Sequence, residues 1–213
     1  MIIAVDGPAA SGKGTLAAGL AGYYRLPHLD TGLLYRAVGR AAARFDNTEA
    51  FEAEAIRAAQ HVNLDDLNPE ALGSAEIGVL ASRVAVIGAV REALFDHQRR
   101  FALRPGGAVL DGRDIGTTIA PDADVKLFIE ADSRARMERR ARQLEARGVA
   151  VDRYQLFHQI EERDARDRLN PNGGFFPAAD AHLLDTTQLD IEAALRAAVA
   201  IVDGVMATKA PRF

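Results

Sequence analysis

The chain has 213 residues, and its 30 Asp and Glu residues outnumber its 26 Lys and Arg residues, which gives a net charge of −4. Because it contains no cysteine, disulfides, thiolate zinc sites and cysteine nucleophiles are excluded. An acidic chain with 6% aromatic residues lacks the basic and stacking surfaces that a nucleic-acid polymer requires. The length suits one domain, no apolar run could cross a bilayer, and the N-terminus does not resemble a signal peptide. We expect a cytoplasmic monomer without a membrane partner.

Short apolar segments alternate with helical patterns along the chain. Predicted strands cover residues 1–5, 108–110, 125–129 and 183–184. Helical patterns cover residues 15–25, 35–45, 75–103, 132–147, 154–168 and 191–205. Strands that alternate with helices form a parallel sheet with helices on both faces. The predicted fold class is therefore α/β with three layers.

A glycine-rich loop follows the first predicted strand and opens the first helix. Its G-x4-G-K pattern is typical of a P-loop, in which backbone N–H groups and a helix N-terminus surround phosphate oxygens. Lys13 is expected to bridge the β- and γ-phosphates, and Thr15 to offer its hydroxyl to phosphate or Mg²⁺. Gly14 stands where the usual pattern has Ser or Thr, a variant that resembles the nucleoside monophosphate kinases. The predicted nucleotide-binding residues are Gly7, Pro8, Ala9, Ala10, Ser11, Gly12, Lys13, Gly14 and Thr15.

A second segment presents polar side chains near a helix N-terminus. Thr31, Tyr35 and Arg36 lie at the start of the second helical pattern, where an anion is stabilised by the helix dipole. Arg36 can hold a phosphate through two parallel hydrogen bonds. The same residues also suit an ordinary Asp-Thr-Gly turn that caps a helix.

A third segment, Asp-Gly-Arg-Asp-Ile-Gly-Thr at 111–117, follows a predicted strand. Ligands of open α/β sheets bind beyond the carboxyl ends of the strands, so this segment is expected to face the phosphate loop. Asp111 is predicted to hold a Mg²⁺-bound water, Arg113 a phosphate, and Asp114 an amino group. An Arg–Asp surface turn is the alternative interpretation.

Residues 134–168 are rich in arginine and contain no lysine. Arg136, Arg139, Arg140 and Gln143 have the spacing of one helix face. This face is either solvated and laced with ion pairs, or part of a lid that closes arginines over the transferred phosphate. Arg136 is the residue predicted to be catalytic in the second case.

The phosphate loop, Asp-Thr-Gly-Leu-Leu-Tyr-Arg at 30–36 and the segment at 111–117 together resemble the bacterial cytidylate kinase family. The resemblance runs from residue 1 to about 187. It implies a P-loop fold with a small helical acceptor-binding region at about 31–100 and an arginine-rich lid at about 133–173. It also implies ATP and Mg²⁺. Residues implied to bind the acceptor phosphate or its surroundings are Thr31, Arg36 and Arg113, and those implied to contact cytosine are Ser82, Arg91 and Asp114.

Two departures from the family pattern stand out. In the lid motif R-D-x-x-D-x-x-R, Arg163 and Asp167 match and are implied to contact the acceptor sugar and phosphate, but the last Arg is replaced by Asn170. We expect a neighbouring arginine to compensate. Several members carry a β-stranded insert where residues 51–76 lie, but this segment is too short and too rich in alanine. We expect a shorter, helical acceptor region.

The predicted reaction is in-line transfer of the γ-phosphoryl group of ATP to CMP or dCMP, which gives ADP and CDP or dCDP. An acceptor phosphate is already an anion near neutral pH, so no strong general base is needed. The five histidines are accordingly interpreted as surface or packing residues. A UMP or AMP kinase and a nucleotide-binding switch are the alternatives. The predicted catalytic residues are Lys13, Arg113, Arg136 and Arg163.

Overall fold

The computed structural model describes residues 1–170 and 175–209. Within these residues, five parallel strands form one sheet in the order β2-β3-β1-β4-β5. The sheet confirms the predicted α/β class, and its central strands are buried, as expected for a sheet covered on both faces. The strands are β1 (Ile2–Asp6), β2 (His28–Asp30), β3 (Ala108–Gly112), β4 (Val125–Glu130) and β5 (His182–Asp185).

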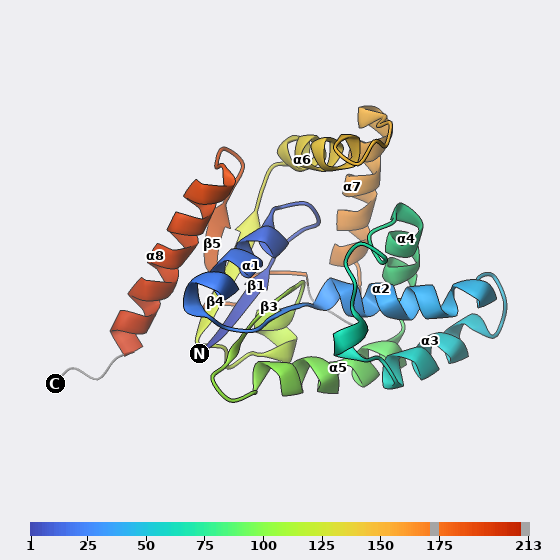
Figure 1. Cartoon of the computed structure of the whole chain (residues 1–213), viewed down its shortest axis with the longest axis horizontal. Coiled ribbons are helices and arrows are strands. Elements are labelled where there is room, and N and C mark those ends of the chain that lie inside the picture. Colours follow the sequence, from blue (N-terminus) through green and yellow to red (C-terminus); the bar gives the residue numbers. More distant parts are fainter. Residues whose placement is uncertain (171–174, 210–213) are drawn as a thin grey trace.

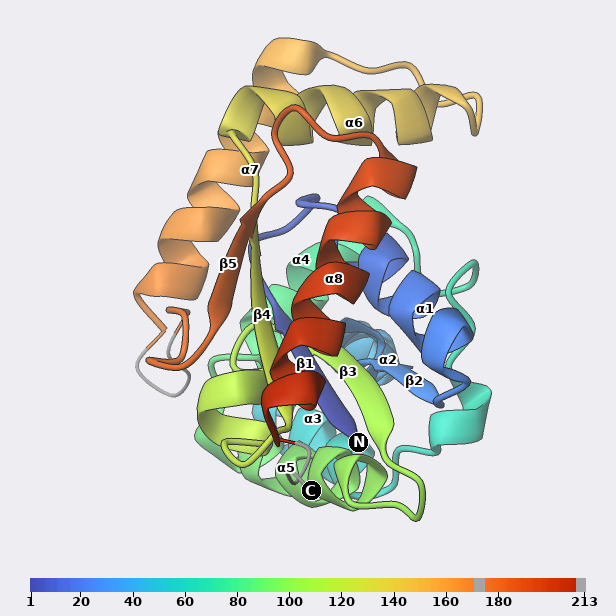
Figure 2. The same ribbon diagram turned by 90° about the vertical axis from the view of Figure 1, so that its left-hand side faces the viewer.

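Helices cover both faces of the sheet. On one face, α1 (Lys13–Tyr24) and α8 (Ile191–Lys209) pack on Ile3, Val5 and Val109. Figure 2 shows these two helices on the opposite side of the sheet from α2 and α3. The other face is covered by helices of the predicted acceptor-binding region, which we call the acceptor-side helices (Figure 1). These are α2 (Thr31–Ala42), α3 (Phe51–Gln60), α4 (Ala75–Val84) and α5 (Gly88–Ala102).

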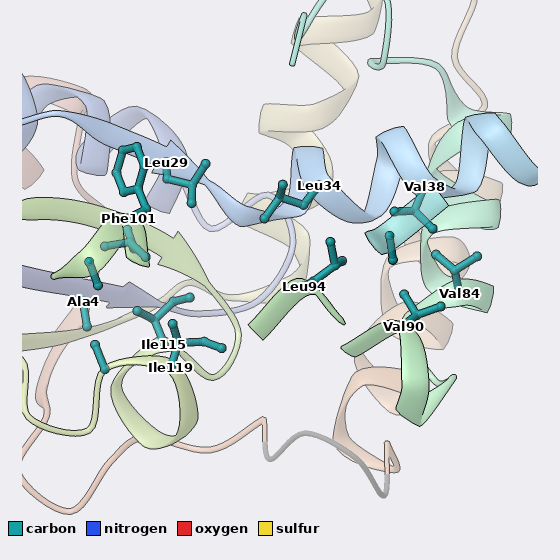
Figure 3. Close-up of a cluster of buried hydrophobic side chains, with 14 of the residues drawn as sticks. Ala4, Leu29, Leu34, Val38, Val84, Val90, Leu94, Phe101, Ile115 and Ile119 are labelled. Carbon is teal, nitrogen blue, oxygen red and sulfur yellow. The ribbon is translucent and has the colours of Figure 1, made fainter. Parts of the chain in front are cut away.

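The acceptor-side helices share one hydrophobic core with the sheet. Leu34 and Val38 of α2 and Leu94 of α5 are buried together with Ala4 of β1 and Ile115 (Figure 3). Residues 51–76 contain α3, the short 3-10 helix η2 (Leu64–Asp66) and the start of α4. The predicted helical replacement for a β-stranded insert is therefore confirmed.

Two helices pair above the carboxyl end of the sheet (Figure 1). They are α6 (Ser133–Glu145) and α7 (Arg153–Arg168), and Ala141, Leu156 and Ile160 form a small core between them. Asp132 caps the N-terminus of α6, because its carboxylate accepts hydrogen bonds from the backbone N–H groups of Arg134 and Ala135. This helix pair lies in the predicted lid, of which residues 171–173 are outside the described residues.

Two features differ from the sequence prediction. The edge strand β2 was not predicted, because it has three residues directly after Pro27. The helical pattern at 75–103 is two helices, α4 and α5, separated by residues 85–87. The remaining short elements are the 3-10 helix η1 (Ala43–Phe45) and the π-helix η3 (Ile115–Ile119). No helix in the described part of the chain is both long and apolar enough to span a membrane.

Candidate active site

The phosphate loop connects β1 to α1 and has the predicted strand–loop–helix context. At Gly7, with φ of +151°, a Cβ would lie 2.2 Å from the carbonyl oxygen of Ile129, so a larger residue cannot fit. Ala10 and Gly12 have φ of +60° and +91°. Left-handed residues within a loop that leads into a helix make a concave anion-binding nest. The loop therefore has the shape that phosphate binding requires.

Lys13 begins α1 and faces a cleft of about 690 Å³. Burial and the nearby Arg113 guanidinium lower the pKa of Lys13 to about 8, while the Asp111 and Asp30 carboxylates oppose this shift. Predicted site residues that line the cleft together with Lys13 are Ala9, Ala10, Thr31, Tyr35, Arg36, Ser82, Arg91, Asp111, Arg113, Asp114, Arg163 and Asp167. The structure thus brings both predicted substrate sides to one cavity.

One wall of the cleft is a polar cluster on α5 and the end of β3. Arg91 forms an ion pair with the buried Asp114 carboxylate, and Arg91 Nη1 donates to the Tyr35 hydroxyl at 3.4 Å. Burial raises the pKa of Tyr35 to about 12. Ser82 donates to the carbonyl oxygen of Gly78 at 3.2 Å. The wall presents a carboxylate that accepts hydrogen bonds beside a guanidinium that donates them. This arrangement is complementary to a nucleobase whose edge carries an amino group next to a hydrogen-bond acceptor.

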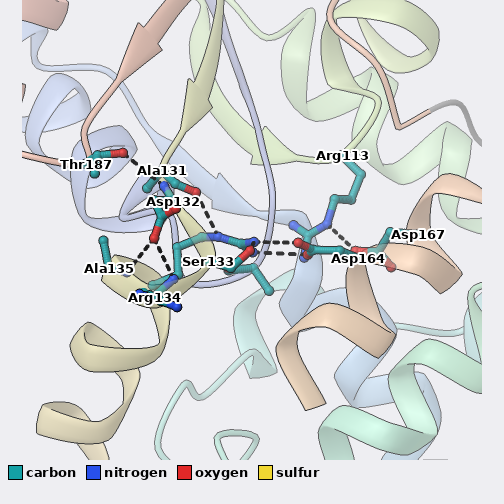
Figure 4. A network of polar contacts seen from close by, with 11 residues as sticks. Arg113, Ala131, Asp132, Ser133, Arg134, Ala135, Asp164, Asp167 and Thr187 are labelled. Atoms are coloured by element: carbon teal, nitrogen blue, oxygen red, sulfur yellow. Dashed lines mark hydrogen bonds and ion pairs between the residues drawn. The ribbon is translucent and has the colours of Figure 1, made fainter. Parts of the chain in front are cut away.

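Cations gather where the acceptor phosphate is expected. Arg113 Nε donates to Asp167 at 2.7 Å (Figure 4), whereas Arg36 Nη1 donates to the carbonyl oxygens of Leu72 at 2.6 Å and Ser74 at 3.0 Å. Burial and the nearby Arg113 lower the pKa of Arg163 to about 10. Its buried Nε has no hydrogen-bond partner in the described part of the chain. An unpaired, buried guanidinium N–H in a cleft is a donor available to an anion.

An oxygen-rich corner lies between β2, β3 and the start of α1. Thr31 Oγ1 donates to the carbonyl oxygen of Asp111 at 2.8 Å, and Asp30 and Asp111 are register partners at the strand ends. Burial and the Asp111 carboxylate raise the pKa of Asp30. Asp111 Oδ2 lies 3.6 Å from the position that a Cβ on Gly14 would occupy, so it points toward the phosphate loop. Carboxylate and hydroxyl oxygens are ligands that suit Mg²⁺.

His28 was missed by the sequence interpretation. Its Nε2 lies 2.8 Å from Asp111 Oδ1, and the Asp111 side chain is buried. The interpretation of the five histidines as surface or packing residues did not anticipate this contact. The missed strand β2 is the reason, since the pairing of His28 with Val109 brings the imidazole beside Asp111.

The Arg136 guanidinium is hydrogen-bonded on every side. Its guanidinium binds Asp164 through two hydrogen bonds of 3.1 and 2.5 Å, and its side chain is 4% exposed. The other donors reach the Ser133 hydroxyl and the carbonyl oxygens of Ala131 and Ala9. An arginine has five N–H donors, and all are used here. Among the described residues, Arg136 does not line the cleft.

The predicted arginine face of α6 is divided. Arg139 contacts the backbone of the phosphate loop, whereas Arg140 and Gln143 line the cleft. Arg140 is a cleft residue that sequence reasoning did not select, although its spacing from Arg136 was noted. Arg136 and Arg139 lie on the side of α6 that packs against the phosphate loop, whereas Arg140 and Gln143 lie on the side that faces the cleft.

Asn170, which stands at the position of a family arginine, lies at the end of α7 and lines the cleft. Its Nδ2 donates to the carbonyl oxygen of Ala85 at 3.3 Å. Ala85 is the C-cap of α4, so this contact joins α7 to the acceptor-side helices. Residues 171–174, which follow Asn170, lie outside the described residues.

A phosphate loop at the carboxyl end of a parallel sheet, with a cationic cleft beside it, defines a P-loop nucleotide kinase. The family model for cytidylate kinase matches residues 3–203. A cytidylate kinase of Methylocella silvestris is 53% identical over 95% of this chain and 94% of its own length. One of Xanthobacter autotrophicus is 54% identical over 95% of this chain and 97% of its own length. The chain belongs to the cytidylate kinase family.

A solved structure of an uncharacterised protein from Eubacterium ventriosum shares the fold. It aligns with a TM-score of 0.57 and 16% identity over 95% of this chain and 98% of its own. At this identity, the likeness concerns the fold alone.

Proposed function

We propose that the chain transfers the γ-phosphoryl group of ATP to the phosphate of CMP or dCMP and releases ADP with CDP or dCDP. The observation that carries this proposal is the placement of the Arg91–Asp114 pair in the same cleft as the phosphate loop. A donor phosphate held by the loop and a cytosine on that pair would be bound in a single cavity. Family membership supports the same reaction.

The acceptor base is recognised by charge and hydrogen bonding. The Asp114 carboxylate accepts from the exocyclic amine of cytosine, and Arg91 and Ser82 donate to the neighbouring acceptors of the ring. Uracil has a carbonyl oxygen in place of the amine, which faces a carboxylate unfavourably. A buried acceptor left unpaired costs about 1–3 kcal/mol, so cytosine is preferred over uracil.

The transfer itself requires alignment and charge stabilisation rather than a strong base. Lys13 holds the β- and γ-phosphates, while Arg113 and Arg163 bind the acceptor phosphate and the transferred group. Thr31, Arg36 and Asp167 position the acceptor, with Tyr35 against its base. Donors already in place at a water-poor site stabilise the developing charge without reorganisation. Arg136, the fourth predicted catalytic residue, is considered separately below because all its donors are engaged.

Asp111 and Thr15 would hold Mg²⁺ together with the ATP phosphates, where the ion neutralises charge on the phosphate oxygens. Asp111 supplies the buried carboxylate and points toward the start of α1. His28 keeps that carboxylate oriented through its contact at 2.8 Å. The loop residues Gly7, Pro8, Ser11, Gly12 and Gly14 complete the donor site through the shape of their backbone.

The experiment that tests the reaction measures ADP release from ATP and Mg²⁺ with CMP, dCMP, UMP, AMP or no acceptor. We expect fast turnover with CMP and dCMP and slow turnover with UMP and AMP. Equal turnover with all four acceptors would contradict the role of the Arg91–Asp114 pair. ADP release that is independent of any acceptor would overturn the kinase proposal in favour of an ATPase or switch.

We further propose that the chain acts as a cytoplasmic monomer and a single domain. On this proposal, residues 31–100 bind the acceptor and residues 133–173 form the lid. The helix pair α6–α7, which lies above the carboxyl end of the sheet (Figure 1), supports this division. Sedimentation of the purified protein at its assay concentration tests the oligomeric state, and a dimer would contradict the expectation.

A further inference from the structure

Two arginines of α6 reach the outer side of the phosphate loop. Arg136 Nη1 donates to the carbonyl oxygen of Ala9 at 3.1 Å, and Arg139 Nη1 donates to that of Ser11 at 3.1 Å. These carbonyls flank Ala10, whose φ of +60° lies in the left-handed region. For a residue with a Cβ, this conformation is unfavourable and persists only where its surroundings impose it. The two guanidinium groups hold the chain on both sides of the strained residue.

Both arginines are themselves fixed. Arg136 is held by the buried Asp164 carboxylate of α7. Arg139 donates to the Thr186 hydroxyl at 3.1 Å and to the Thr186 carbonyl oxygen. The buried Thr186 hydroxyl also lies 3.0 Å from the carbonyl oxygen of Ser11. The supports of the loop therefore come from α6, from α7 and from the end of β5.

We propose that Arg136 and Arg139 are positioning residues that keep the phosphate loop in its anion-binding shape before ATP arrives. By drawing the carbonyl oxygens of Ala9 and Ser11 outward, they leave the N–H groups of the loop for phosphate oxygens. The inference rests on the proposed binding of ATP by this loop. A loop that is already ordered does not lose conformational entropy when the nucleotide binds, which strengthens binding.

The first test is Arg139→Met, which keeps an apolar stem on α6 but removes the donor to Ser11. We expect the Kd and KM for ATP to rise by about tenfold, the size of effect expected for one charge-assisted hydrogen bond. The KM for CMP should change by less than about twofold, since Arg139 lies on the far side of the loop. Arg139→Lys should recover part of the ATP affinity, because lysine can still donate to one carbonyl.

The matched control is Arg142→Met, an exposed arginine on the same helix. It should leave the Kd for ATP unchanged. Equal ATP affinity in Arg139→Met and the parent protein would overturn the inference, and so would an equal loss in Arg142→Met. A general structural defect would instead lower the melting temperature and kcat without a selective change in the KM for ATP.

Hydrogen exchange of the amides at residues 9–13 gives a second measurement, made on the protein without nucleotide. We expect faster exchange in Arg139→Met and in Arg136→Gln combined with Asp164→Asn, a pair that leaves no buried charge unpaired. Unchanged exchange in both would contradict the inference. If the parent protein binds no ATP, the proposed function fails, whereas the exchange measurement still reports whether the arginines order the loop.

Discussion

Lys13 begins α1 beside the phosphate loop and is the cation that we propose holds the donor phosphates. Burial and Arg113 lower its pKa to about 8, so its charge is poorly compensated until phosphates arrive. Lys13→Ala should therefore lower kcat by about 10²–10³, the range seen when one stabilising group is removed from an active site. Steady-state kinetics at saturating CMP measures the loss, and circular dichroism checks that the fold is retained. A variant that keeps most of its activity would contradict the assigned role.

Asp6 ends β1 and accepts hydrogen bonds from the backbone N–H groups of Ile115 and Gly116, both at 2.8 Å. Burial raises the pKa of Asp6 from 3.8 to about 7, while these two hydrogen bonds oppose the shift. Between these pH values, the native protein binds a proton at Asp6 that the unfolded chain does not. The contribution of Asp6 to stability is therefore present at acid pH and is lost as the pH rises toward 7.

The Asp6→Asn variant isolates this effect. We expect the free energy of unfolding of the parent protein, relative to Asp6→Asn, to decrease as the pH rises through this window. Urea unfolding of both proteins at a series of pH values measures the difference, and other carboxylates cancel in the comparison. Parallel pH profiles would show that Asp6 keeps the same pKa in the native and unfolded states.

At the scale of elements, α7 bridges the two substrate sides. Its Asp164 binds Arg136, which contacts the phosphate loop, and Asn170 at its end contacts the C-cap of α4. Asn170→Arg would restore the charge that the family motif has at this position. If a neighbouring arginine compensates only in part, the KM for CMP should fall by about tenfold, because a charge-assisted hydrogen bond contributes about 1.5–3 kcal/mol.

The control for this variant is Asn170→Gln, which lengthens the side chain without adding charge. It should not lower the KM for CMP. An unchanged KM in Asn170→Arg would show that compensation is complete, for instance by Arg166, which also lines the cleft. A higher KM would show that an arginine at this position does not bind the acceptor.

Elements with a strong local signal could be predicted from the sequence. The runs at β1, β3 and β4 are apolar and β-branched, and the G-x4-G-K loop has few alternatives. The sheet class and the strand–loop–helix context of the phosphate loop could therefore be predicted. Strand β2 could not be predicted, because a strand of three residues shows too little periodicity. The His28–Asp111 contact, which depends on this strand, was therefore not predicted either. The break between α4 and α5 has no Gly or Pro at 85–87, so the helical pattern continues across it.

The direction of the α6 arginines was also beyond sequence reasoning. Arg136 and Arg140 are one turn apart, yet Arg136 is bonded to Asp164 and the phosphate loop while Arg140 lines the cleft. Helical spacing shows which residues share one face of a helix, but it does not show which part of the molecule that face contacts. Ser82 and Arg91 illustrate a different case, since only the family resemblance selected them, and the structure places both in the cleft.

At the scale of the whole molecule, the acceptor-side helices and the sheet are parts of one core. Leu94 is fully buried in it, among residues of α2, α5, β1 and β3. Leu94→Ala should lower the free energy of unfolding by about 2–5 kcal/mol, the cost of a large-to-small change in a core. Because the core is continuous, unfolding should remain a single transition in both proteins.

Urea unfolding followed by far-UV circular dichroism and by tyrosine fluorescence tests this expectation, since the chain has no tryptophan. Coincident curves from the two signals support a single cooperative unit. Two separated transitions would show that the acceptor-side region unfolds by itself and would contradict the single-domain proposal.

The bridge formed by α7 has a thermodynamic consequence. Near its C-terminus, this helix is tied to the phosphate loop through Asp164 and Arg136, and Asn170, just beyond its last residue, contacts the C-cap of α4, so ordering it for one nucleotide also orders it for the other. Any factor by which bound CMP strengthens the binding of ATP must then equal the factor by which bound ATP strengthens the binding of CMP. Each substrate thereby acts as an effector of the other. When the acceptor is absent and water can reach the γ-phosphate, the cleft lacks the ordering that the acceptor would supply.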